Sequence, residues 1–303
     1  MPEFTDRRKP LQIGLRAHDY GAGVTIEELA ETLDVYKPSS IQLALSKALK
    51  GAPPPGGLSP AYARRIRKVL EEKNIAIAVL GCYINPIHPD KIEREKQLYN
   101  FEEHLRYARD FNCAMVGTET GSCNADCSFH PDTEKQESFD LLCESLERLV
   151  TTAEKCGSIA AIEAVADIHT ISTIEKMEAL QRRLASPALK VIYDPVNLIP
   201  NAGLAETQKE FFLRAFSAFG GKITTIHAKD FRMENGLKNG RYSAGLGEMD
   251  YPALLSVIMK EKPDIDILLE DTSPSTGKQA MEFLQETALK YNFYGGGLCY
   301  GKN

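Results

Sequence analysis

The segment KVIYDPVNL, residues 190–198, is a short apolar run that presents an aspartate and then, three residues later, an asparagine. The part that leads to the aspartate, 189–194, has the composition of a buried strand. Proline disfavours the helical conformation of the residue before it, so Pro195 should keep Asp194 extended and end the strand. The strand is therefore expected to present a carboxylate at its carboxyl end.

Similar apolar runs recur along the whole chain and alternate with amphipathic stretches typical of helices. The runs are apolar almost throughout, as in parallel strands that are covered on both faces. Eight such alternating units favour an α/β fold of the (β/α)8 TIM-barrel type, and no G-x-G-x-x-G motif supports an open dinucleotide-binding sheet. The predicted strands are 11–16, 40–45, 75–82, 113–119, 158–165, 189–194, 222–228 and 266–270. The predicted helices are 25–36, 60–73, 91–111, 134–156, 172–185, 206–219, 251–261 and 276–291.

The units follow one another without a visible boundary, so residues 1–293 are predicted to form a single TIM-barrel domain. Residues 294–303 are rich in glycine and are predicted to be a flexible tail. Three connections, 47–59, 120–132 and 229–250, exceed the usual loops of roughly 2–6 residues. Each of them follows a strand, so the long loops fall on the face where TIM barrels carry their active sites.

The overall charge and composition limit the classes of partner. With 36 basic and 42 acidic residues the net charge is −6, whereas nucleic-acid binding requires concentrated positive charge. No apolar stretch approaches the roughly 20 residues that span a bilayer, and the first residues lack the apolar core of a signal peptide. The seven cysteines show no regular spacing, as expected for reduced thiols. We therefore expect a cytoplasmic protein without a nucleic-acid or membrane partner.

Four consecutive predicted strands bring metal-ligating side chains to their carboxyl ends. These are Glu163 on the fifth strand, Asp194 on the sixth, His227 on the seventh and Glu270 on the eighth. Because these strand ends meet at one rim of a barrel, the four side chains are expected to hold one divalent ion. Three carboxylates and one imidazole suit Mn²⁺, Mg²⁺ or Co²⁺ better than a structural zinc, although zinc is also possible. Taken singly, each acid could instead cap a helix or pair with a lysine.

The segments IEAV (162–165), YDPVN (193–197), IHAKD (226–230) and LLED (268–271) carry a family resemblance in their order and spacing. They resemble the sugar phosphate isomerase/epimerase family, the xylose-isomerase-like TIM barrels that include the ketose 3-epimerases. The resemblance covers essentially the whole barrel. It implies that the four strand-end residues bind one divalent cation and that the two glutamates act as acid and base. In the epimerases a histidine usually stands where this chain has Asn197, which cannot act as an acid.

The implied chemistry removes a proton beside a carbonyl and gives an enediolate, a step that a Lewis-acidic metal assists. If Glu163 and Glu270 flank the sugar, one can take the proton and the other can return it from the opposite face. The sequence therefore indicates a metal-dependent isomerase or epimerase of a sugar, sugar phosphate or related keto-polyol. Because barrels of the resembled family often associate, a homo-oligomer is also expected to be possible. Two alternatives remain open: an inosose-type dehydratase, which shares the first step, and a non-catalytic sugar-binding barrel. The apurinic-site endonucleases share the barrel but need further histidine ligands and DNA, so they are disfavoured.

Several further polar residues follow predicted strands and are candidates for contacts with the substrate. For each of them the alternative is a hydrogen bond or ion pair within its own loop. His169, six residues after Glu163, is expected to cap a helix or face solvent instead. The candidate substrate-binding residues are Asn197, Lys229, Glu119, His18 and Arg232.

Overall fold

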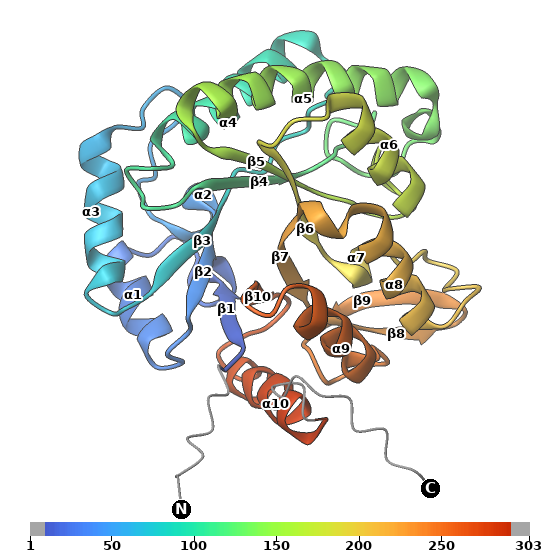
Figure 1. Cartoon of the computed structure of the whole chain (residues 1–303). Coiled ribbons are helices and arrows are strands. Elements are labelled where there is room, and N and C mark those ends of the chain that lie inside the picture. The colour runs from blue at the N-terminus through green and yellow to red at the C-terminus, as the bar shows by residue number, and fades with distance from the viewer. Residues whose placement is uncertain (1–9, 292–303) are drawn as a thin grey trace, which may run out of the picture.

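The computed structural model describes residues 10–291, which form a closed barrel of parallel strands inside a ring of helices (Figure 1). Around the barrel the strands follow the order β1-β10-β7-β6-β5-β4-β3-β2, and β2 returns to pair with β1. Their bounds are β1 (Gln12–Arg16), β2 (Ser40–Leu43), β3 (Ala76–Gly81), β4 (Met115–Glu119), β5 (Ile159–Glu163), β6 (Leu189–Tyr193), β7 (Ile223–Ala228) and β10 (Asp266–Leu269). The predicted TIM barrel is confirmed.

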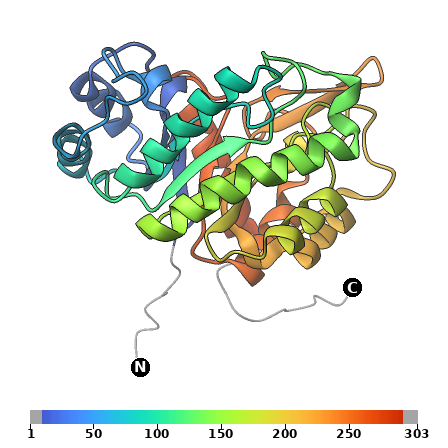
Figure 2. The ribbon, with the colours of Figure 1, turned by 90° about the horizontal axis from the view of Figure 1, so that it is seen from above.

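One long helix follows each barrel strand and covers its outer face (Figure 2). Side-chain caps start several of these helices: Thr25 and Thr207 each form a reciprocal capping box with a glutamate three residues on. The long helices are α1 (Ile26–Asp34), α3 (Pro60–Glu71), α4 (Lys91–Tyr107), α5 (Gln136–Cys156), α6 (Ile174–Leu184), α8 (Gln208–Phe219), α9 (Tyr251–Glu261) and α10 (Gly277–Lys290). Short turns of helix are α2 (Leu45–Ala48), α7 (Pro195–Leu198), η1 (Ala17–Asp19), η2 (Pro131–Glu134) and η3 (Gly220–Lys222).

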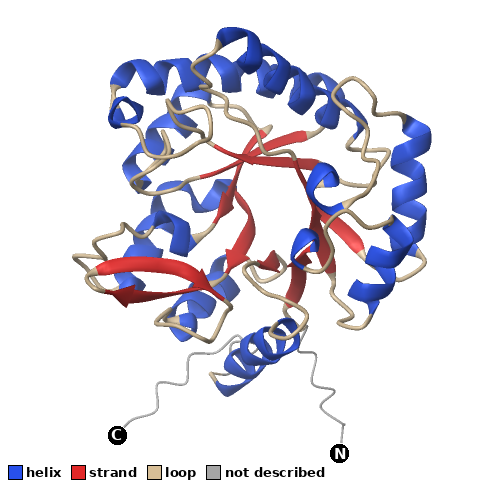
Figure 3. Ribbon diagram, turned by 180° about the vertical axis from the view of Figure 1, so that it is seen from behind, coloured by secondary structure: helices blue, strands red, loops and turns tan. Residues whose placement is uncertain are grey.

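The connection 229–250, expected to be an irregular loop, contains an antiparallel hairpin outside the barrel sheet. Its strands are β8 (Asp230–Glu234) and β9 (Leu237–Tyr242), and Figure 3 shows them apart from the ring of barrel strands. Glu234 pairs with Leu237, so the loop is the dipeptide Asn235-Gly236 with φ of 53° and 79°. Two positive φ values in a two-residue loop are typical of a type I′ turn, for which Asn-Gly is the preferred sequence. The dipeptide was therefore the signal for the hairpin.

The barrel strands are buried on both faces, which explains why they are apolar without alternation. Among the described helices, none combines the length and the apolar character needed to cross a membrane. The six described cysteines are free. The predicted tail, 294–303, lies outside the described residues.

Candidate functional site

Three carboxylate side chains and one imidazole meet at the carboxyl ends of neighbouring strands. Glu163 ends β5, Asp194 follows β6, His227 lies near the end of β7, and Glu270 follows β10. Each offers one ligand atom, and these atoms all lie within 4.8 Å of one another. All four residues are buried. The structure thus brings together the four residues that the sequence singled out.

The histidine of this cluster is oriented by an amide on another strand. His227 Nε2 lies 2.6 Å from Oε1 of Gln42 on β2. The other end of this amide donates from Nε2 to the Tyr83 hydroxyl at 2.7 Å. Since an amide oxygen only accepts, His227 Nε2 must carry the proton. In the neutral ring, Nδ1 is then the free lone pair, as in a metal ligand whose other ring nitrogen is held by a hydrogen bond.

Nδ1 of His227 faces carboxylate oxygens. It lies 3.1 Å from Glu163 Oε2 and 3.4 Å from Glu270 Oε1, yet it makes no hydrogen bond to either of them. Asp194 Oδ2 also makes no hydrogen bond of good geometry, although Lys229 Nζ lies 2.9 Å away. Carboxylates that are buried this close together repel one another unless cations lie among them. The cluster could therefore hold a metal ion, and its oxygen-rich donor set fits a divalent one.

The two glutamates have different proton affinities. Burial raises the pKa of Glu163 to about 7, although the neighbouring His227 opposes this. Burial would also raise the pKa of Glu270, but His227, Lys229 and Arg16 outweigh it and hold that pKa below its usual range. For His227, the carboxylates outweigh the opposite effect of burial and raise the pKa to about 9. Glu163 is thus the carboxylate that takes up a proton more readily near neutral pH.

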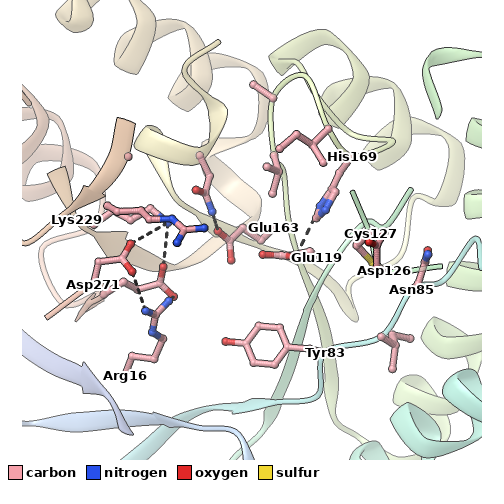
Figure 4. Close-up of a pocket in the computed structure, with 18 of the residues that line it drawn as sticks. Arg16, Tyr83, Asn85, Glu119, Asp126, Cys127, Glu163, His169, Lys229 and Asp271 are labelled. Carbon is pink, nitrogen blue, oxygen red and sulfur yellow. Dashed lines mark hydrogen bonds and ion pairs between the residues drawn. The ribbon is translucent and has the colours of Figure 1, made fainter. Parts of the chain in front are cut away.

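Two cations support the cluster from its edge (Figure 4). Lys229 Nζ lies 2.9 Å from Asp194 Oδ2 and 3.2 Å from Glu270 Oε2, and its pKa is raised by these acids against the effect of burial. Arg16, at the end of β1, places Nη1 3.2 Å from Glu270 Oε1. The hydroxyl of Tyr251 donates to the Lys229 carbonyl at 2.8 Å and so fixes the backbone behind the lysine.

The segment YDPVN forms a strand end followed by a single helical turn. Asp194 has an extended backbone, as expected before proline, and caps α7 by accepting a hydrogen bond from the Asn197 backbone at 2.9 Å. Pro195 occupies the first position of the turn, where a missing N–H costs nothing. The turn points the amide of Asn197 back toward the cluster, where Nδ2 donates to Glu163 Oε1. Asn197 is therefore placed to orient this carboxylate.

A cavity of about 800 Å³ opens beside the cluster, and Glu163 and Glu270 lie in its wall. Of the candidate substrate-binding residues, Glu119, Asn197 and Lys229 also line it. The lining does not include His18, whose ring packs edge-on against Tyr83 with centroids 6.1 Å apart. It does not include Arg232 either, whose guanidinium donates to the Leu246 carbonyl. The cations that β9 contributes to the lining are Lys238 and Arg241.

His169 is placed differently from its sequence-based expectation. The expected solvent exposure is wrong, because the side chain is only 5% exposed and lines the cavity. Its Nδ1 lies 3.8 Å from Oε2 of Glu119. The loop between β5 and α6 folds back over the strand ends, with the His169 backbone donating to the Val165 carbonyl at 3.2 Å, and this brings the ring inward.

Two residues near the site were missed from the sequence. Gln42 is a buried polar residue within the apolar run SIQLAL, and this contrast was an available signal. Tyr83 follows β3 and lines the cavity, but an isolated tyrosine after a strand carries no such signal. Both act through contacts with residues distant in sequence.

The fold and the site together define a class: parallel (β/α)8 barrels with a carboxylate–histidine cluster at the carboxyl ends of their strands. The chain belongs to the xylose isomerase-like TIM barrel family, whose model matches residues 39–287. No curated protein matches the chain in sequence.

Solved structures similar to this chain share its fold at low sequence identity. A D-tagatose 3-epimerase-like protein is 15% identical with a TM-score of 0.74, over 93% of this chain and 98% of its own. The IOLI protein with a bound zinc atom is 14% identical with a TM-score of 0.71, over 95% and 100% of the two chains. A xylose isomerase-like TIM barrel protein from Mycobacterium smegmatis in complex with magnesium is 15% identical with a TM-score of 0.67, over 95% and 99%.

Proposed function

We propose that this protein is a divalent-metal-dependent isomerase or epimerase of a sugar, sugar phosphate or related keto-polyol, acting through an enediolate. The observation that carries the proposal is the convergence of Glu163, Asp194, His227 and Glu270, whose ligand atoms lie within 4.8 Å of one another beside an open cavity. These four residues would hold one Mn²⁺, Mg²⁺, Co²⁺ or Zn²⁺ ion. When bound, such an ion supplies Lewis-acid stabilisation of negative charge on the substrate oxygens.

The protein's own residues would carry the proton. Glu163, which ends β5 in the wall of the cavity, would take a proton from the carbon beside the carbonyl. Asn197 donates to Glu163 Oε1 and so fixes this carboxylate, whose Oε2 lies 3.1 Å from His227 Nδ1. Glu270 would pass a proton to the opposite face of the sugar, which inverts the centre, and the ammonium of Lys229, 3.2 Å from its Oε2, would supply that proton. Similarity to a D-tagatose 3-epimerase-like protein supports this type of reaction.

Two other functions start from the same site. An inosose-type dehydratase would share the proton abstraction and then expel a hydroxyl group. A non-catalytic sugar-binding barrel would keep the cavity without turnover. The presence of both Glu163 and Glu270 in the cavity wall favours an enzyme, because a binding site has little reason to keep an acid on each side of a metal.

The test combines metal analysis with a substrate screen. The purified protein is reconstituted with each of the four metals and incubated with ketoses, their phosphates and keto-inositols in D₂O. We expect conversion to an isomer that carries one solvent deuterium, on the carbon that lost its proton if the product is an epimer and on the former carbonyl carbon if it is an aldose–ketose isomer. A product lighter by one water would identify the dehydratase instead, and absence of conversion by every metal form would favour the binding barrel.

Substitution of the glutamates assigns the roles. At saturating metal, Glu163→Gln and Glu270→Gln should each lower turnover by roughly 100-fold or more, the usual size of an acid–base contribution, while the variants stay folded. Glu137→Gln, at an exposed position on α5, is the matched control and should behave as wild type. Wild-type turnover in both site variants would contradict the proposed mechanism.

A further inference from the structure

The cavity wall beyond Glu163 carries a second polar pair, Glu119 and His169, that the proposed proton transfers do not use. Glu119 ends β4 and pairs in register with Glu163 at the end of β5. In the close-up of Figure 4, the His169 ring points at the Glu119 carboxylate, and Glu163 lies between this pair and Lys229. The pair therefore faces the part of a bound substrate that lies away from the cluster.

Both groups of this pair are hydrogen-bond acceptors. A contact with the Cys127 backbone raises the pKa of the His169 ring, so in this contact the ring N–H is the donor. Nδ1 has no hydrogen-bond partner, so the donor is Nε2 and Nδ1 carries the free lone pair. Burial lowers the pKa of His169, which keeps the ring neutral. At 3.8 Å the carboxylate of Glu119 and this lone pair are too far apart for a hydrogen bond.

Two facing acceptors call for donors from a ligand. Nδ1 of His169 is buried and unpartnered, which is costly unless something donates to it. The Glu119 side chain is 34% exposed and is therefore free enough to turn toward a ligand. Hydroxyl groups on neighbouring carbons can donate one to each acceptor. A phosphate ester cannot, because at neutral pH its oxygens are largely acceptors and carry negative charge.

The cations of the cavity are mostly engaged elsewhere. Arg16 pairs with Asp19, Glu270 and Asp271, and Lys238 donates to two backbone carbonyls near α7. Lys47 lies over the Tyr83 ring at 3.7 Å from its centroid, within electrostatic reach of Glu119. Asp126 adds another carboxylate to this part of the lining. Arg241 of β9 is a further cation of the lining. The cation that acts on Glu119 is Lys47, whereas phosphate sites bring several basic groups together.

We propose that Glu119 and His169 form a subsite for hydroxyl groups remote from the reacting carbonyl, and that the substrate is an unphosphorylated ketose or keto-polyol. This inference rests on the proposed function, which defines the carbonyl end of the substrate as the end that reacts. The two residues determine specificity: Glu119 and His169 accept from the remote hydroxyls, while the cluster acts on the carbonyl end.

The test is calorimetric binding at saturating Mn²⁺ with three free polyols and two phosphates as probes: D-fructose, D-tagatose, myo-inosose, fructose 6-phosphate and tagatose 6-phosphate. We expect at least one free polyol to bind, and each 6-phosphate to bind about ten-fold or more weakly than its parent sugar. Glu119→Gln and His169→Phe should each weaken polyol binding by about ten-fold or more. Manganese stoichiometry and the unfolding midpoint confirm an intact cluster and fold in each variant, and Glu137→Gln is the control.

Each remaining outcome overturns the inference: tighter binding of a 6-phosphate, no binding of any free polyol, or wild-type affinities in both variants. If His169→Phe does not fold, Glu119→Gln decides alone, because its side chain keeps its size at a partly exposed position. If the wild type binds free polyols but converts none, the proposed enzymatic function is wrong and the subsite inference stands. If the wild type converts ketoses and both variants keep its substrate profile, the enzymatic function stands and the subsite inference is wrong.

Discussion

His227 on β7 and Gln42 on β2 form a hydrogen bond of 2.6 Å although 185 residues separate them in the chain. With the amide in this orientation Nε2 carries the proton of the bond, and Nδ1 faces the carboxylates of Glu163 and Glu270. Gln42 is itself held by Tyr83, so the histidine is oriented through two side chains from other strands. Metal-ligating histidines depend on such support, and its loss commonly weakens metal binding by about 10- to 100-fold.

We therefore predict that Gln42→Leu weakens divalent-metal binding by about 10- to 100-fold with all four cluster residues intact. Leucine removes the acceptor and leaves the buried Nε2–H without a partner. Competitive titration of Mn²⁺ and Zn²⁺ against a chelator measures the change. Gln136→Leu, at the exposed start of α5, is the control. Equal affinities in wild type and Gln42→Leu would show that the contact does not orient a ligand.

Metal binding is also expected to stabilise the fold. The cluster concentrates three buried carboxylates, and an ion that binds the folded form alone stabilises it by mass action, about 2.7 kcal/mol at 100 times its dissociation constant. Thermal unfolding should therefore shift upward with added Mn²⁺ and downward with a chelator. In Asp194→Asn the metal-dependent shift should shrink strongly. If the midpoint of thermal unfolding changes with neither added metal nor chelator, the cluster does not bind a metal.

The barrel and its cluster could be predicted because their signals are local. Each barrel strand is a continuous apolar run, and Glu163, Asp194 and Glu270 stand where such runs stop. The geometry of a closed parallel barrel then brings consecutive strand ends together. The hairpin β8–β9 was also marked locally, by Asn235-Gly236, but a long polar connection obscured it.

The inner lining of the site could not be predicted, because it depends on contacts across the barrel. Gln42 matters only because β2 lies opposite His227, and His169 turns inward only because its loop folds back over the strand ends. Arg232 and Arg241 belong to the same hairpin, yet only the second lines the cavity. Which side of an exposed hairpin faces a cavity is set by its docking, which the sequence does not encode locally.

Barrel packing leaves no free room for a side chain at Gly117. A Cβ on Gly117, in β4, would lie 2.6 Å from Ile192 Cδ1 and 2.8 Å from Val79 Cγ1. We predict that Gly117→Ala destabilises the protein by about 1–3 kcal/mol, the usual cost of overpacking a core. Gly221→Ala meets no atom within 4 Å and should be neutral or slightly stabilising. Urea unfolding of the two variants compares them, and equal stabilities would mean that the barrel relaxes around the added methyl group.

The pair Arg148–Glu102 joins α5 to α4. Arg148 binds both oxygens of Glu102, at 3.0 and 2.9 Å, and the Glu102 side chain is only 10% exposed. Arg148→Met leaves this carboxylate with Thr152 and Arg106 as its partners. We predict a loss of roughly 1–3 kcal/mol, below the ~3–5 kcal/mol of fully buried pairs, because Arg148 is 35% exposed and these partners remain. Arg182→Met, which breaks a surface pair with Glu178, should cost at most about 0.5 kcal/mol. Equal losses in chemical denaturation would show that burial of Glu102 is not decisive.

A buried histidine far from the cluster should make stability depend on pH. Burial lowers the pKa of His104, against smaller effects of its bond to the Asn100 carbonyl and of Glu103. The unfolded chain, with a histidine pKa of about 6.5, then binds a proton that the folded chain resists, so folding stability falls as pH drops below about 6.5. This residue contributes a slope of at most about 1.4 kcal/mol per pH unit, and nothing above about pH 7.5. His104→Gln should remove that slope. Urea unfolding at pH 7.5 and 5.5, with metal content held constant, measures the free energy of unfolding at each pH. The decrease between the two pH values should be smaller in the variant than in the wild type. Equal decreases would mean that protonation of His104 does not destabilise the fold.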